Sequence, residues 1–440
     1  MFGDIEEQLK LKWVYENSDY IKLANQVNWD SLCTPLEQAY CRNNGRKSLN
    51  TRRMLALEIL KHLLKLSDEK LVHQLQTNLE VQYFCGIQNM YEDTMMEPSS
   101  LTHFRKRLTK HPEILEAIQK AHLTEAIRKL PKKRQGQYDQ DGTVIEEKIK
   151  YPNDIELLKD MTQKWAKIVD KARGFLQKAW KKVVDIMVAR GKRLAKNLYL
   201  KYSFTKKKTK DLCEQTRKEM KKYGESMIKQ VEDIYEKVKH SKNKEIKVLK
   251  RKIKEYVGIG KEVLRQQRKM IKSETKSISW RIVSFAKPYI RPIVKGKSGK
   301  RTQFWAKAHI WLVGGKVAVA VGLWRENEHE SKHIVEGIRL VESVRGKLPS
   351  EVWYDKWWRS QAVYKYLEEK WITNGIQGSA KRKKLPRNQR KRLYNRRAFV
   401  ENVINDVLNH RGVNKSLYAQ ENAQWNLLMG CMASNLIRIR

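Results

Sequence analysis

The sequence predicts an α/β core that follows an all-α N-terminal domain and is interrupted by a long helical insertion after its first strand. Three patterns support this prediction. Leucine-rich stripes at helical spacing dominate residues 1–125, a heptad-like apolar stripe recurs through residues 155–275, and apolar segments bounded by turn residues surround that stripe. We therefore expect a helical domain over residues 1–125 and an α/β domain over residues 132–440, interrupted at 155–275.

The N-terminal domain is predicted from three amphipathic helices. Apolar residues recur at helical spacing over residues 54–64, Ser67-Asp68-Glu69 is typical of the start of the next helix, and Ser99 starts a third helix whose second half is basic. Short helices with a basic third member are typical of a helix-turn-helix-like DNA-binding unit. The alternative is an ordinary helical cap or a dimerisation domain.

The α/β core is predicted from the segments on either side of the insertion. Residues 138–150 are expected to form a strand. Gly314-Gly315 separates two apolar runs and predicts a tight hairpin with a two-residue loop, because glycine readily adopts positive φ. The order after the hairpin is a helix at 330–345, a strand at 351–354, a helix at 360–369, a short strand at 375–378 and a final helix that carries Glu401.

The composition indicates a polyanionic partner. The chain of 440 residues has 92 Lys and Arg against 49 Asp and Glu, a net charge of +43, which attracts nucleic acid or, as the competitor, an anionic membrane surface. No run approaches the roughly 20 apolar residues of a membrane span. The five cysteines are scattered and lack zinc-ligand spacing, so we expect a reduced cytoplasmic protein that does not act in a membrane.

Three carboxylates stand out against this positive charge. Asp141 lies on the first predicted strand, Asp355 ends a later strand and Glu401 lies on the final helix. This order of elements matches the ribonuclease-H-like fold, in which acids from different elements converge on two divalent cations. Asp139 lies two residues before Asp141 and faces the same side of a strand, so spacing alone leaves both as candidates.

The same blocks resemble the DDE transposases of bacterial insertion sequences, the group with an InsH-like N-terminal domain and a ribonuclease-H-like catalytic core. The resembling segments are Asp141-Gly-Thr-Val-Ile-Glu with Tyr151-Pro-Asn-Asp154, Val352-Trp-Tyr-Asp355, and Tyr394-Asn-Arg-Arg397-Ala-Phe-Val-Glu401, with Leu66-Ser-Asp-Glu69 and Phe84-Cys-Gly86 in the N-terminal domain. The resemblance selects Asp141 over Asp139. It implies that Asp141, Asp355 and Glu401 bind two Mg²⁺ (or Mn²⁺) ions.

The resemblance also implies roles for two neighbours and reveals a departure. Arg397 is expected beside the scissile phosphate or Glu401, and Tyr394 is expected to stack or hydrogen-bond on DNA. The family has lysine seven positions after the glutamate, where this chain has Leu408, and Arg411 or Lys415 is the candidate replacement. A catalytically impaired or domesticated DNA-binding protein and a ribonuclease-H-like nuclease are therefore the alternatives to an active transposase.

The expected partner is double-stranded DNA, both the terminal inverted repeats and the target. Two ends must be held together, which favours a homodimer. The basic insertion is expected either to clamp DNA or to pair protomers. Further basic residues are candidate DNA contacts, namely Arg105, Lys106, Arg107, Lys295, Lys297, Lys300, Arg359, Lys381, Arg382, Lys383 and Lys384.

Overall fold

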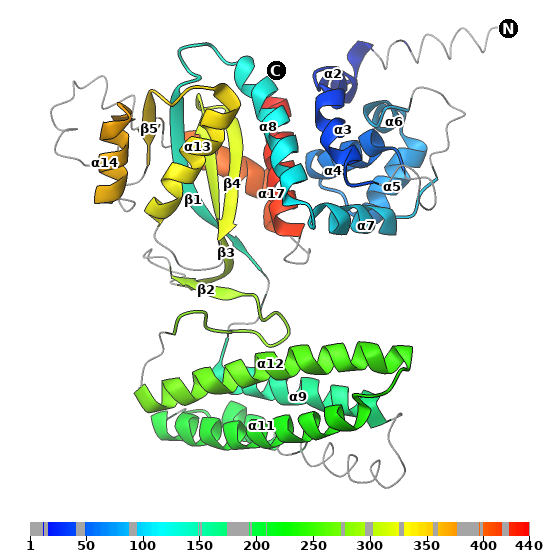
Figure 1. The fold of residues 1–440 in the computed structure, drawn as a ribbon, viewed down its shortest axis with the longest axis vertical. Coiled ribbons are helices and arrows are strands. Elements are labelled where there is room, and N and C mark those ends of the chain that lie inside the picture. Colours follow the sequence, from blue (N-terminus) through cyan, green and yellow to red (C-terminus); the bar gives the residue numbers. More distant parts are fainter. Residues whose placement is uncertain are drawn as a thin grey trace. The chain divides into compact units, whose positions relative to one another are not determined.

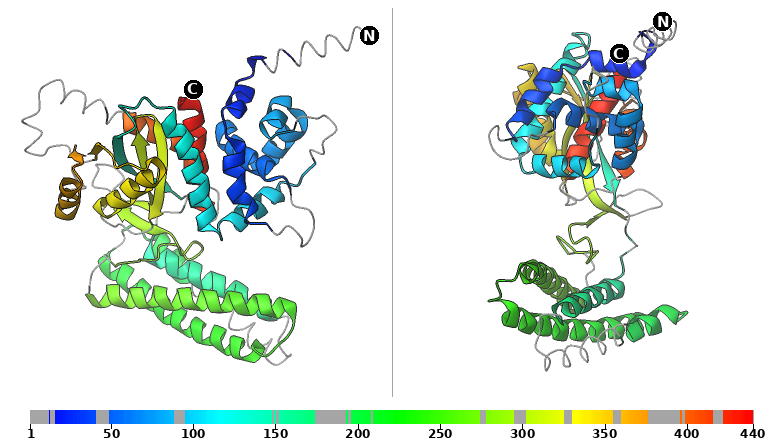
Figure 2. Two further views of the ribbon diagram at one scale, coloured as in Figure 1. Left: turned by 45° about the horizontal axis from the view of Figure 1, so that its top comes forward. Right: turned by 90° about the vertical axis from the view of Figure 1, so that its right-hand side faces the viewer.

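A computed structural model divides the chain into two compact units, which are described separately below (Figures 1 and 2). The first unit comprises Met1–Ile145 and Lys307–Arg440, and the second comprises Glu146–Ala306. The predicted insertion at 155–275 lies within the second unit. The structure describes residues 12, 16–40, 49–87, 95–147, 149, 152–173, 193, 196–207, 209–273, 278–294, 302–324, 330–354, 360–375, 396, 399–415 and 422–439.

The predicted N-terminal helices are present. Ser67 is the N-cap of α5, and its hydroxyl accepts from the Lys70 amide at 3.3 Å. Asn50 caps α4 in the same way, through the amides of Arg52 and Arg53. The helices of this part are α2 (Asp19–Asn25), α3 (Trp29–Glu37), α4 (Thr51–Leu64), α5 (Asp68–Thr77), α6 (Leu79–Phe84), α7 (Ser99–Leu108) and α8 (Pro112–Arg128).

A mixed sheet follows these helices in the first unit. Its strands are β1 (Gln137–Glu146), β3 (Thr302–Val313), β4 (Val317–Trp324), β5 (Glu351–Trp353) and β6 (Thr373–Asn374). The order across the six-stranded sheet is β2-β3-β1-β5-β6, where β2 is Arg291–Val294, and β4 also pairs with β3. Strand β3 runs antiparallel to β4, whereas β5 is parallel to both β1 and β6. The Gly314 amide donates to the Gln137 carbonyl at 2.8 Å, and the Glu147 amide donates to Phe304 at 3.0 Å, so β1 and β3 are antiparallel.

The hairpin differs in detail from its prediction. Gly314 and Gly315 have φ of +63° and +72°, as expected for a tight turn. However, Val313 pairs with Val317, so the loop has three residues and includes Lys316. The short strand predicted at 375–378 is also displaced, because β6 is Thr373–Asn374 and residues 376–378 lie outside the described part of the chain.

One helical layer packs against the sheet. Side chains of α8, α13 (Ile334–Arg345) and α14 (Gln361–Glu369) form one buried cluster with residues of β1, β3, β4 and β5. A short 3-10 turn, η1 (Glu330–His333), precedes α13. Tyr138 and Trp311 meet edge to face in this cluster, with ring centroids 6.1 Å apart. Apolar burial on this face therefore fixes the register of the strands that carry the candidate acids.

Helix α17 (Ala423–Arg438) was not predicted and is central to the first unit. It contacts α4 and β4, and its Trp425, Met429 and Met432 join the core of the N-terminal helices. Asn435 covers β4, accepting from the Ala318 amide at 2.6 Å and donating to the Ala318 carbonyl at 2.8 Å. These bonds satisfy backbone groups that an uncovered strand edge would expose.

A buried histidine, His122, contacts Asn435, and its burial predicts that the stability of the fold depends on pH. Asn435 Nδ2 lies 3.1 Å from His122 Nε2, which must accept and is therefore unprotonated. Burial lowers the pKa of His122 to about 4, from 6.5. Between pH 6.5 and 4, His122 is protonated in the unfolded chain but stays neutral in the folded chain. The free energy of unfolding therefore falls as pH falls through this range. The contribution of His122 to this loss is about 3 kcal/mol at about 1.4 kcal/mol per pKa unit.

Urea unfolding of wild type and His122→Gln at neutral and acidic pH would measure this effect. The variant should lose less stability than wild type on acidification. An exposed histidine on α5, His73, provides the control, and His73→Gln should retain the wild-type pH dependence. Equal pH slopes in all three proteins would contradict the assignment to His122.

Three long helices form most of the described part of the second unit, namely α9 (Asp154–Arg173), α11 (Lys210–Val238) and α12 (Lys244–Ser273). The described parts of the predicted apolar stripes are buried, as Met161, Met227 and Ile253 illustrate, and residues 174–192 lie outside the described part of the chain. Gly260 of α12 lies so close to the Trp165 ring that a Cβ there would be 2.0 Å from it. Strand β2 (Arg291–Val294) pairs antiparallel with the first residues of β3. Across the described residues, no helix has both the length and the apolarity needed to cross a membrane.

Candidate active site

Two parallel strands at the centre of the sheet, β1 and β5, position the candidate acids Asp139, Asp141 and Asp355 in the sequence. In the β1–β5 pair, Gln137 is level with Glu351 and Asp139 is level with Trp353. Parallel strands end at the same edge of a sheet, so the carboxyl end of β1 and that of β5 share one edge. Asp141 lies two residues beyond Asp139 on β1. Asp355 follows β5 by two residues and lies outside the described residues.

Asp139 is committed to an ion pair. Its side chain is buried, its Oδ1 lies 2.8 Å from Arg396 Nε, and its Oδ2 accepts from Arg396 NH2 at 3.1 Å. Arg396 also contacts Glu351 Oε1 at 2.6 Å. Burial raises the pKa of Asp139 to about 6, and the Arg396 guanidinium opposes the rise. Asp139 is therefore paired with Arg396, through a hydrogen bond to Oδ2 and a close charge contact to Oδ1.

Asp141 has a different environment on the same strand. It is half-buried, and its Oδ1 accepts from the Gly142 amide at 2.8 Å. The residue after it, glycine, leaves this part of the strand without a bulky neighbour. The structure thus distinguishes two acids that sequence spacing could not separate. Of the pair, Asp141 is the more accessible carboxylate.

Glu401 lies in a helical segment, residues 399–405, and is exposed. This segment continues into a π-helical turn, η3 (Asp406–His410), where Leu408 is buried. Arg411 does not replace the missing lysine as an available cation. Its guanidinium contacts Asp406 Oδ1 at 3.2 Å, and its carbonyl lies 2.7 Å from His62 Nδ1.

Several predicted site residues lie outside the described residues. Besides Asp355, they are Tyr394, Arg397, Arg359, Lys295, Lys297, Lys300, Lys381, Arg382, Lys383 and Lys384. Sequence reasoning also missed Arg396. Its neighbour Arg397 fitted the family pattern, and nothing in the spacing indicated that Arg396 would pair with Asp139 and Glu351 across 257 and 45 positions of the chain.

The prediction that Arg105 contacts DNA requires correction. Arg105 is 1% exposed and forms ion pairs with Glu58 at 2.7 Å and with Asp68. Its guanidinium is therefore enclosed in the helical core and cannot reach a phosphate. Lys106 and Arg107, the next two residues of α7, are exposed, and Arg107 lies over the Tyr40 ring at 4.4 Å.

The carboxylates fit a hard divalent cation in their chemistry. Oxygen ligands are those that Mg²⁺ and Mn²⁺ prefer, and both Asp141 and Glu401 offer them from partly or fully exposed positions. Asp139 does not fit, because Arg396 occupies it. Within the described residues, no cluster of three or more potential metal-ligating side chains is present. A complete site would therefore need a ligand from beyond them, and Asp355 is the candidate.

Comparison with known proteins bears on the N-terminal helices. Residues 10–107 match the family model for a transposase domain (DUF772). The resemblance to transposases predicted from the sequence is confirmed for this segment, which runs through α7 and stops before the sheet. The match does not extend to the candidate acids.

A curated relative is similar to part of this chain. The "Uncharacterized protein ORF8 in nfe locus" of Rhizobium meliloti is 27% identical over 177 residues, which is 40% of this chain and 84% of that protein. No solved structure matches the chain. The topology of the sheet must therefore be judged from its own strand order.

Proposed function

We propose that this chain is a metal-dependent transposase that cleaves DNA at the ends of a mobile element and joins the freed 3′-hydroxyl to target DNA. Terminal inverted repeats and target DNA would be its substrates, and a homodimer would hold two ends together. Such a protein would act on DNA in the bacterial cytoplasm. The transposase-domain match over residues 10–107 supports this role in general terms.

The observation that carries the catalytic part is the strand order around β1. The path β4-β3-β1-β5-β6, in which β3 is antiparallel to β4 and β1 while β5 and β6 are parallel to β1, fits the strand order expected of a ribonuclease-H-like sheet and supports this proposal. In that fold the central strand carries the first catalytic acid. Asp141 occupies the central strand here and is the more accessible of its two candidate acids, Asp139 and Asp141.

The residues would share the chemistry as follows. Asp141, Asp355 and Glu401 would hold two Mg²⁺ or Mn²⁺ ions, which activate the attacking oxygen and stabilise the leaving oxygen when bound. Arg397 would stabilise charge on the scissile phosphate, and Tyr394 would contact the DNA beside it. Arg396 would keep Asp139 away from the metal and stabilise the end of β1 against β5.

An assay of the full chain tests this proposal. Labelled duplex carrying the flanking inverted repeat, a target plasmid and Mg²⁺ should yield nicked ends and strand-transfer products. Glu401→Gln should lower the cleavage rate about a thousandfold, because losing a metal ligand removes several kcal/mol of transition-state stabilisation and each 1.4 kcal/mol is about tenfold. Glu368→Gln, an exposed acid on α14, is the matched control and should cleave like wild type.

Leu408 favours a second candidate, a DNA-binding protein without catalysis. It is buried in η3, at the position where the resembling family has lysine, and Arg411 is engaged with Asp406. This candidate predicts repeat-specific binding without metal-dependent cutting. Cutting without strand transfer would instead indicate a ribonuclease-H-like nuclease. Wild-type cleavage equal to that of Glu401→Gln would contradict the catalytic assignment.

A further inference from the structure

The positive charge of the second unit is concentrated on one helix. Helix α12 has eleven Lys or Arg and three Glu, whereas α11 has seven basic and seven acidic residues and α9 has five and four. General solubility does not require such an imbalance between neighbouring helices. The excess therefore marks one face of this unit as a candidate interaction surface.

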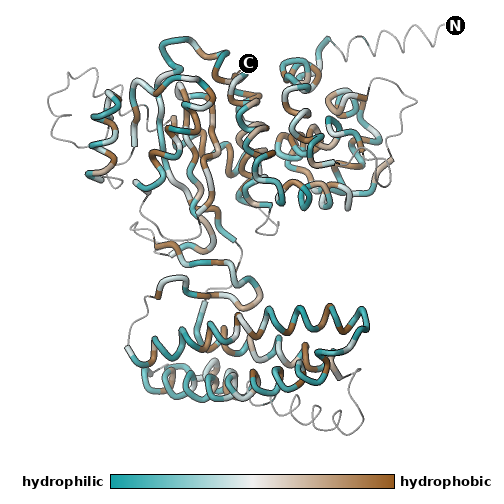
Figure 3. The backbone as a smooth tube through the Cα atoms, in the orientation of Figure 1, coloured by the Kyte–Doolittle hydropathy of each residue, from teal (hydrophilic) through white to brown (hydrophobic). Residues whose placement is uncertain are grey.

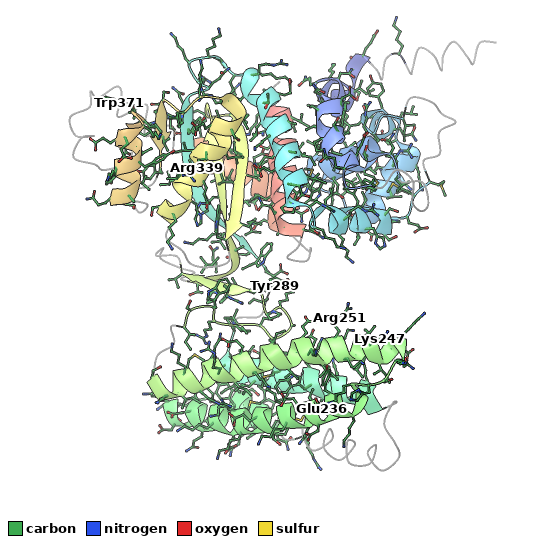
Figure 4. The ribbon with its side chains drawn as sticks, in the orientation of Figure 1. Glu236, Lys247, Arg251, Tyr289, Arg339 and Trp371 are labelled. Carbon is green, nitrogen blue, oxygen red and sulfur yellow. The ribbon has the colours of Figure 1, made fainter. Side chains whose placement is uncertain are left out.

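The basic residues of α12 form a continuous outer stripe. The buried residues, which include Ile246, Leu249 and Ile253, point into the core shared with α9 and α11. On the opposite side, basic residues recur at steps of three and four with Gly258 as the one interruption, at Lys244, Lys247, Arg251, Lys254, Lys261, Arg265, Arg268 and Lys272. Hydrophilic positions recur along α12 in Figure 3, and Figure 4 labels Lys247 and Arg251 on its outer side.

Local acids neutralise three successive basic residues of this stripe, Lys261, Arg265 and Arg268. Lys261 pairs with Glu232 of α11, Arg265 pairs with Glu262 at 2.6 Å, and Arg268 pairs with Glu225 of α11 at 2.9 Å. In the part of the chain that the structure describes, no ion pair involves the other basic residues of the stripe, namely Lys244, Lys247, Arg251, Lys254 and Lys272, or Lys269 beside Arg268, and all six are exposed. Two groups of available cations remain.

The separation of these two groups matches double-stranded DNA. From Lys247 to Lys269 the helix advances 22 residues, and from Arg251 to Lys272 it advances 21 residues, which is about 32 Å at about 1.5 Å per residue. One turn of B-DNA is about 34–36 Å. A straight helix lying along a duplex would therefore bring its two cationic ends to phosphates about one turn apart on the same side of the DNA.

Other anionic partners fit this surface less well. A helix that binds a membrane surface inserts an apolar face into the lipid, but the apolar face of α12 is buried in the unit's core. Single-stranded nucleic acid is held by aromatic stacking, and the single aromatic residue of α12, Tyr256, is half-buried with Lys164 over its ring at 4.8 Å. A second copy of the same stripe would be repelled.

We infer that the outer face of α12 binds the phosphate backbone of duplex DNA without reading its sequence. This inference rests on the proposed function and adds to it a surface that holds DNA. The surface is remote in sequence from Asp141. Backbone binding of this kind positions DNA and supplies affinity, while sequence recognition is left to other parts of the chain.

Binding measurements on the full chain test this inference. The probe is a fluorescent duplex of about 30 base pairs, about three helical turns, that lacks the inverted repeat. The stripe variant is Lys247→Gln/Lys269→Gln/Lys272→Gln. Its matched control removes the same charge from exposed lysines of α11, Lys210→Gln/Lys222→Gln/Lys229→Gln. Anisotropy titrations between about 50 and 200 mM salt give the affinity and its salt slope.

The stripe variant should bind the duplex at least about tenfold more weakly. Its log–log salt slope should fall by about 0.9 for each phosphate that the protein no longer neutralises, or by up to about 2.7 in all. The control should keep the wild-type slope. Equal reductions in both variants, or none in either, would overturn the inference. So would a reduction seen equally with single-stranded DNA, or seen only with anionic phosphatidylserine vesicles.

This readout separates the surface from the catalytic proposal. Binding to a duplex without the repeat requires no cleavage. If wild type fails to cleave but the stripe variant alone loses duplex binding, the surface stands and the proposed catalysis fails. If wild type cleaves and the stripe variant binds like its control, the surface is wrong and the catalysis stands. Equal melting temperatures of both variants and wild type would verify that folding is unchanged.

Discussion

Arg105→Met is expected to destabilise the first unit by about 3–5 kcal/mol and to lower its melting temperature by about 10 °C. Arg105 NH1 lies 2.7 Å from Glu58 Oε1, and its guanidinium also pairs with Asp68. Glu58 is fully buried, and its other oxygen accepts from Trp425 Nε1 at 2.8 Å. Burial raises the pKa of Glu58, and Arg105 is the strongest influence that opposes the rise. Without Arg105 a buried carboxylate loses its main counter-ion.

The control for this experiment is Lys106→Met, since Lys106 is the exposed neighbour of Arg105 on α7. It should change the unfolding free energy by no more than about 0.5 kcal/mol. The double variant Glu58→Gln/Arg105→Met should recover part of the lost stability, because it removes the uncompensated charge. Thermal unfolding followed by circular dichroism measures all three. An Arg105→Met protein as stable as Lys106→Met would show that the buried pair is not needed.

The same network explains why α7 is a poor candidate for direct phosphate contact through Arg105. A basic run on a short third helix was a reasonable signal for DNA binding, but periodicity distinguishes the members of that run. Arg105 lies one and four positions after the buried Phe104 and Leu101, on the apolar face of α7. Lys106 and Arg107 lie on the exposed face. The helix was predictable from the sequence. The inward position of Arg105 was not, because it depends on ion pairs with residues of α4 and α5.

Elements with a contrast between apolar and polar positions were predicted well. The helices of the second unit show a clear period of 3.6, and the β3–β4 hairpin is marked by Gly314-Gly315 between two apolar runs; both occur where expected. Helix α17 was missed because nearly every position from Ala423 to Leu436 is buried, so no polar face marks its period. Strand β6 was displaced because two residues leave too little sequence for a pattern.

The candidate site was predictable only in part. Sequence order placed Asp141 on a strand, and the strand is the central one of the sheet. The distinction from Asp139 depended on a contact with Arg396, 257 positions away in the chain, which local patterns do not encode. Long-range pairing of this kind is decided by packing of the whole unit, so the sequence alone could not exclude Asp139 on physical grounds.

Asp141→Asn is expected to lower Mg²⁺-dependent end cleavage about a thousandfold while leaving the melting temperature close to that of wild type. The substitution keeps the size of a half-buried side chain, and an amide oxygen can still accept from the Gly142 amide. It removes the negative charge that a divalent cation needs. Cleavage of labelled end-DNA and thermal unfolding, measured on the same preparation, test both parts of this expectation.

Asp139→Asn, on the same strand, is expected to lower stability but to retain cleavage, the opposite of Asp141→Asn. Among the described residues, it leaves Arg396 with Glu351 as its one ionic partner in a largely buried position, so the melting temperature should fall. Cleavage measured well below that temperature should remain within about tenfold of wild type, since Asp139 is not assigned to the metal. The reverse outcome, in which Asp139→Asn abolishes cleavage and Asp141→Asn retains it, would transfer the catalytic role to Asp139.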